Sequence, residues 1–144
     1  MWYHINDNDG LQMFMHDFSY FHDSCIKEMH YVSGAYVDDE LAMYPINDQR
    51  SLRVIIQRQS RNLPVVELLF EGLKYLKLFP LDPAYTCEIL DSTMILRNDR
   101  IYWCDIGGLS EADLDGYNGT VICASRLRWR PVNRSEDGSL SCRI

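Results

Sequence analysis

The sequence has no apolar run of the roughly 18 residues that a membrane-spanning helix needs. Its first ten residues, MWYHINDNDG, lack the basic region and apolar core of a secretory signal. Internal repeats and tracts of low complexity are also missing. These absences favour a cytoplasmic protein that makes no contact with a membrane.

Motifs of common enzymes and metal sites are missing as well. The chain contains no GxSxG, HExxH or phosphate-loop segment. Its five cysteines are dispersed and never spaced as CxxC, so we expect neither a disulfide framework nor a zinc ribbon. The acidic run at 37–45 lacks the spacing of a calcium loop and is expected to be a solvated turn. The sequence therefore predicts no enzyme and no cofactor.

Lysine is scarce, and charge is unevenly distributed. Three lysines and eleven arginines face 21 acidic residues, which gives a net charge of −7. Nine of the acids lie within the first 50 residues, whereas the sequence from Arg126 onward is rich in arginine. A negatively charged protein repels nucleic acid and attracts basic partners. We therefore expect a protein partner with a basic surface, and no nucleic acid.

The residues that are abundant indicate a packed core. The chain is 47% hydrophobic and 12% aromatic, and its 144 residues suit a single domain, 1–144. Leu11, Phe14 and Phe18 recur at helical spacing and predict an N-terminal helix over 8–20, with Asp7 or Asp9 as its cap.

After this helix the hydrophobic period shortens to two, which predicts an antiparallel sheet over 22–130. Turn residues at 61–62 and 98–99 predict two hairpins, and Glu71-Gly72 is expected to end a strand. Ser110 is expected to cap a one-turn helix, and 131–144 is expected to be a loose tail. The predicted class is mainly β: an antiparallel β-sandwich or partly open barrel of six or seven strands.

The stretch YFHDSCIKEMHY, residues 20–31, collects residue types that bind metals. His22 and His30 are eight residues apart, which is roughly 26 Å along a strand and roughly 12 Å along a helix, so they cannot share one metal. A nucleophilic Cys25 would need a general base such as His22. In a strand these two side chains point to opposite faces, which disfavours that pairing. We interpret His22, Asp23 and Ser24 as a helix-to-strand junction whose side chains satisfy backbone groups.

Arginines alternate along the last predicted strand. Arg126, Arg128 and Arg130 share one face, which is either a solvated outer face or a site for a carboxylate, phosphate or acidic partner. In the second case, a pocket at the mouth of the sheet would combine these arginines with Tyr102 and Trp103.

Two short motifs carry a resemblance to a known family. Phe21-His22-Asp23-Ser24 opens the first predicted strand, and a later predicted strand ends in the turn Phe70-Glu71-Gly72-Leu73. Over residues 20–105 the chain resembles small bacterial β-rich proteins of the immunity protein 50 type, which belong to polymorphic toxin systems. The resemblance implies a binding role without catalytic residues and assigns no ligand.

Three functional hypotheses result. The first is a non-enzymatic module that binds another protein, with neutralisation of a basic toxin as one form. The alternative is a β protein that binds a small molecule or anion through an arginine–aromatic pocket. The third is an enzyme or metal site around His22, Asp23 and His30. The sequence leaves the oligomeric state open.

Overall fold

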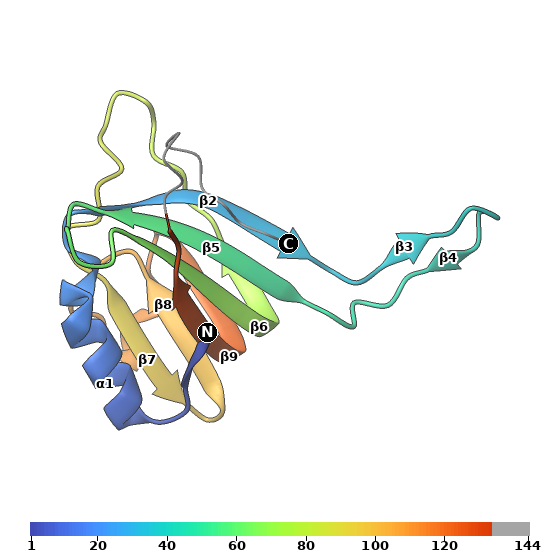
Figure 1. Ribbon diagram of the computed structural model, residues 1–144. Helices are drawn as coiled ribbons and strands as arrows, with labels where there is room; N and C mark the ends of the chain where they lie inside the picture. Colours follow the sequence, from blue (N-terminus) through green and yellow to red (C-terminus); the bar gives the residue numbers. More distant parts are fainter. Residues whose placement is uncertain (134–144) are drawn as a thin grey trace.

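A computed structural model describes residues 1–133 of the chain. Figure 1 shows a twisted sheet with a helix packed beside it and a thin hairpin that projects away from the body. In chain order the elements are β1 (Tyr3–Ile5), α1 (Asn8–Asp17), η1 (Ser19–Phe21), β2 (Ser24–Val32), β3 (Tyr36–Val37), β4 (Met43–Tyr44), β5 (Ser51–Arg58), β6 (Val65–Lys77), β7 (Thr93–Arg97), β8 (Arg100–Cys104), η2 (Glu111–Asp113) and β9 (Val121–Pro131).

The main sheet is antiparallel throughout, with the strand order β2-β5-β6-β9-β8-β7 and with β1 added along β9. Strands β3 and β4 form a separate two-stranded sheet. The mainly β, antiparallel class with one N-terminal helix is therefore confirmed. The main sheet contains seven strands and is not a closed barrel.

Helix α1 begins where the sequence predicts and ends earlier. The Asp7 carboxylate accepts a hydrogen bond of 2.7 Å from the backbone N–H of Gly10, which caps the first turn. The helix ends at Asp17 because residues 19–21 all have positive φ, between 50° and 59°. The predicted helix over 8–20 is thus a ten-residue α-helix followed by a tight turn, and that turn places Phe21 in the core.

The core lies between α1 and one face of the main sheet. Phe14, Phe18 and Phe21 form an aromatic cluster with ring centroids 4.7 to 5.7 Å apart. The ring of Trp129 from β9 lies 5.0 Å from that of Phe18, in an edge-on arrangement. Alternate residues of β5, β6 and β9 supply the opposite wall, among them Leu52, Val54, Val66, Leu68, Phe70 and Leu127.

The prediction that Glu71-Gly72 ends a strand is wrong. Strand β6 continues to Lys77, and its pairing with β9 shifts register between Leu73 and Tyr75. Gly72 has a φ of 61°, which favours glycine, and an added Cβ would lie 2.8 Å from the Ser125 hydroxyl oxygen. The glycine therefore permits the close approach to β9 at this point, and the bulge that follows at Leu73–Tyr75 bends β6 without ending it.

The predicted turns are confirmed. Asn98 and Asp99, with φ of 50° and 58°, join β7 to β8, and residues 59–64 join β5 to β6. Ser110 and Asp113 form a capping box at η2. Of the predicted tail, Pro131 belongs to β9, whereas 134–144 lie outside the described residues.

The aromatic cluster makes a direct prediction about stability. Phe18 is fully buried, so Phe18→Ala is expected to lower the free energy of unfolding by about 3–5 kcal/mol, because truncation leaves a cavity. Met13 lies on the exposed side of α1 and serves as the control. Met13→Ala is expected to change the free energy of unfolding by less than about 0.5 kcal/mol. Urea denaturation of both variants checks this packing, and equal effects would contradict it.

Candidate functional site

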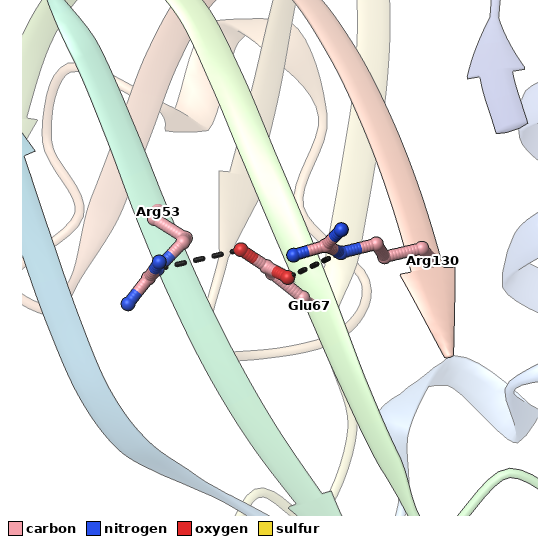
Figure 2. Close-up of polar contacts among 3 residues, drawn as sticks. All are labelled: Arg53, Glu67 and Arg130. Atoms are coloured by element: carbon pink, nitrogen blue, oxygen red, sulfur yellow. Dashed lines mark hydrogen bonds and ion pairs between the residues drawn. The ribbon is translucent and has the colours of Figure 1, made fainter. Parts of the chain in front are cut away.

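A buried carboxylate occupies the outer face of the main sheet, the face opposite α1. The side chain of Glu67 on β6 is only 1% exposed. Its two oxygens are held by Arg53 of β5 at 3.3 Å and by Arg130 of β9 at 2.6 Å, as Figure 2 shows. Removal of such a carboxylate from water is costly unless opposite charges compensate for it, and here two guanidinium groups do so. Arg130 therefore has a structural partner.

Arg128 also interacts with other side chains of the protein. Its Nη2 lies 3.2 Å from the carboxylate of Glu71. The guanidinium carbons of Arg128 and Arg130 lie 5.0 and 4.4 Å from the centre of the Trp2 ring, which is a cation–π arrangement. Two of the three arginines that the sequence singles out thus connect β9 to β6 and to Trp2, the residue before β1.

Arg126 differs from its two neighbours. It lies opposite Glu71 in the β6–β9 ladder, but the Glu71 carboxylate pairs with Arg128. Within residues 1–133, Arg126 makes no ion pair. Its side chain is exposed and lines an open groove of about 610 Å³. Of the three alternating arginines of β9, Arg128 and Arg130 therefore have structural partners, and Arg126 is accessible to a ligand.

The predicted pocket of arginines with Trp103 and Tyr102 is not formed at this groove. Trp103 is 1% exposed and packs edge-on against Phe21 in the core, because the β8–β9 register turns it towards the helix side. Tyr102 is half-buried opposite Cys123, and burial raises its pKa. Neither residue lines the groove that holds Arg126.

The triplet His22, Asp23 and Ser24 lies between η1 and β2. The imidazole Nδ1 of His22 lies 3.0 Å from the Asp23 carboxylate, so these two side chains meet each other. Ser24 donates a hydrogen bond of 3.4 Å to the His22 carbonyl, and the Asp23 carbonyl accepts from Gln59. Across residues 1–133, no three His, Cys, Asp or Glu side chains are grouped so that they could hold a metal.

Two buried cysteines of the sheet, Cys104 and Cys123, are poor nucleophiles. Burial, aided by the charge of Asp105, raises the pKa of the Cys104 thiol to about 11. Burial also raises the pKa of Cys123. A buried thiol with a raised pKa is protonated near neutral pH and is therefore unreactive.

The most distinctive feature is a projecting segment between β2 and β5, residues 33–50, which we call the arm. Figure 1 shows it extending well beyond the body, on the side away from α1. Strands β3 and β4 pair within it, with Tyr36 opposite Tyr44 and Val37 opposite Met43. The two tyrosine rings stack with centroids 4.7 Å apart and an angle of 11° between their planes.

The tip of the arm is organised by one carboxylate. Asp38 accepts hydrogen bonds from the backbone N–H groups of Glu40 at 3.0 Å and Ala42 at 2.9 Å. Its backbone carbonyl accepts a further bond from Leu41, which has a φ of 66°. This turn presents Leu41 at the end of the arm with 84% of its surface exposed.

Backbone hydrogen bonds hold the two sides of the arm together at its base. The Ser33 carbonyl accepts hydrogen bonds from the backbone N–H groups of Gln49 and Arg50, at 3.1 and 3.2 Å. Gly34 has a φ of 98°, and a Cβ there would lie 1.9 Å from a carboxylate oxygen of Asp48. The two sides of the arm thus approach each other more closely than any other residue type at position 34 would allow.

Apart from Arg50 at its base, the arm combines apolar side chains with charge of one sign. Its exposed large apolar residues are Tyr36, Val37, Leu41, Met43, Tyr44 and Ile46. Residues 33–49 contain four acids and no basic residue, and Arg50 follows at the junction with the body. The sequence interpretation of 37–45 as a solvated turn identified the exposure and missed the hairpin. The pairs Tyr-Val and Met-Tyr on either side of a short acidic loop were the available signal.

No family model, curated protein or solved structure matches the chain. The resemblance to immunity proteins therefore stays a prediction. Among residues 1–133, no helix has both the length and the apolar character to span a bilayer.

The ion pairs of Glu67 generate a second prediction. Glu67→Gln removes the charge that neutralises two part-buried arginines, and is expected to lower the free energy of unfolding by about 3–5 kcal/mol. The control Glu71→Gln acts on a pair that reaches solvent and is expected to cost about 0–1 kcal/mol. Urea denaturation at pH 7 measures both. A similar loss in the two variants would show that burial of Glu67 has no special role.

Proposed function

We propose that the protein is a non-enzymatic binding module whose arm inserts into a partner protein with a basic, partly apolar surface. The observation that carries this proposal is the arm itself, a defined hairpin that exposes six large apolar side chains away from the body. Tyr36 and Tyr44 lie on one face of this two-stranded ribbon and Val37 and Met43 on the other. Exposed apolar side chains gathered on one projecting segment are typical of an interaction site in a soluble protein. Tyrosine and methionine are also enriched in protein interfaces.

The short pairing within the arm supports the same conclusion. Two residues on each strand give little independent stability, since an isolated hairpin is marginal in water. The arm nevertheless keeps Leu41 and Met43 mostly in solvent, at 84% and 68% exposure. A partner that covers these side chains would remove apolar surface from water and stabilise the hairpin.

Charge narrows the class of partner. The four acids of the arm are Asp38, Asp39, Glu40 and Asp48. They would be repelled by the phosphates of nucleic acid and by an anionic lipid surface. They would also repel the arm of a second copy held alongside. A basic protein surface instead attracts them and raises the rate of association.

Photocrosslinking in cells that make the protein tests this proposal and captures the partner whatever its identity. Leu41→p-benzoylphenylalanine places the crosslinker at the tip of the arm, and Tyr85→p-benzoylphenylalanine is the control at an exposed position outside the arm. We expect a crosslinked species specific to position 41 that contains a basic protein. Crosslinks only between copies of this chain, or equal yields from both positions, would contradict the proposal.

The purified pair then gives a quantitative form of this test. Tyr36→Ser is expected to weaken binding about thirtyfold, because loss of one central interface aromatic costs about 2 kcal/mol. Tyr85→Ser is the matched control, since it removes an exposed tyrosine from the loop between β6 and β7 and should leave the affinity unchanged. Calorimetric titration measures both constants, and equal affinities for the two variants would exclude the arm as the contact.

Neutralisation of a basic toxin is the more specific form of this proposal. It rests on the resemblance to immunity proteins and on the acidic arm. It requires that a reading frame next to this gene encodes the crosslinked partner. A partner encoded elsewhere would remove the immunity form and leave the binding role intact.

A further inference from the structure

A second surface, independent of the arm's apolar tip, is an open groove of about 610 Å³. It lies where the base of the arm, the bulge of β6 and the β7–β8 turn meet β9. Four cationic residues line it, and each comes from a different part of the chain: Arg50, Lys74, Arg100 and Arg126. Asp99 is the single acid in its lining.

These four cations differ from the other basic residues of the sheet. Arg53, Arg128 and Arg130 all pair with carboxylates on the outer face. By contrast, none of the four cations of the groove forms an ion pair within residues 1–133. A protein with a net charge of −7 thus gathers unpaired positive charge at one hollow. Such a concave cationic surface raises the local concentration of anions.

Neutral polar groups complete the lining. Asn6, Asn98 and Ser125 contribute side chains to the groove, alongside the apolar Ile5 and Leu96. The Ser125 hydroxyl lies 3.3 Å from the Gly72 carbonyl and donates to it, which leaves its oxygen free to accept. The groove therefore offers positive charge together with neutral groups that both donate and accept hydrogen bonds, and its lining is more polar than apolar.

We propose that this groove binds a small phosphate-bearing molecule. Three arginines supply planar groups that can donate two hydrogen bonds each to phosphate oxygens, and Lys74 adds a mobile point charge. Four cations against one acid suit a ligand with more than one negative charge. A volume of about 610 Å³ holds a small molecule rather than a single ion.

Calorimetric titration with inorganic pyrophosphate tests this site in the full chain at low salt. We expect saturable 1:1 binding that weakens as salt is added, because the groove is open to solvent. Arg126→Gln should weaken this binding about tenfold or more, since it removes a charge-assisted hydrogen-bond donor. Lys74→Gln is a second variant at an exposed position and should weaken binding in the same direction.

The matched control is Arg61→Gln, which removes an exposed arginine from the β5–β6 turn, outside the groove. It should leave the dissociation constant unchanged. Three results would overturn the proposal: no heat of binding at millimolar pyrophosphate, equal losses in Arg126→Gln and Arg61→Gln, or citrate binding as tightly as pyrophosphate. The last result would show that the groove selects charge and not phosphate. Because no residue of the arm's tip is altered, failure here leaves the arm proposal unaffected.

Discussion

The position of Glu67 constrains the rest of the structure. Its carboxylate is tolerated on the outer face only because Arg53 and Arg130 reach it from the two flanking strands. This requirement favours one register for β5, β6 and β9, since a shift of one residue would place Glu67 in the apolar core. The same register directs alternate apolar residues of these strands, such as Val54, Leu68 and Leu127, towards α1 and its aromatic cluster.

The two proposed surfaces follow from this arrangement. The β5 register places Arg50 where the arm joins the body, and the Leu73 N–H donates to the Arg50 carbonyl at 2.8 Å. The bulge between Leu73 and Tyr75 then bends β6, and Lys74 within it lines the groove with Arg126 of β9. Acidic charge gathers on the arm and basic charge in the groove beside its base. We propose that the first binds a basic protein and the second a small phosphate compound.

Local features could be predicted from the sequence, whereas features that depend on distant neighbours could not. The Asp7 cap, the Asn98-Asp99 turn and the Ser110 capping box each involve residues within a few positions of one another. By contrast, the Arg130–Glu67 pair joins residues 63 positions apart, so the sequence does not reveal which arginines of β9 are neutralised. Trp103 is placed in the core by its register with β9. The arm was missed because strands of two residues are too short to show a period.

The proposed binding role requires that the arm of the free protein stands away from the body with its apolar side chains uncovered. Small-angle X-ray scattering tests this directly, by comparison of the full chain with a variant in which residues 34–49 are replaced by a short glycine linker. We expect a monomeric mass for the full chain and a maximum dimension that falls by roughly 25 Å in the variant, the length of about eight extended residues. An unchanged maximum dimension, or a dimeric mass that becomes monomeric on deletion, would contradict it.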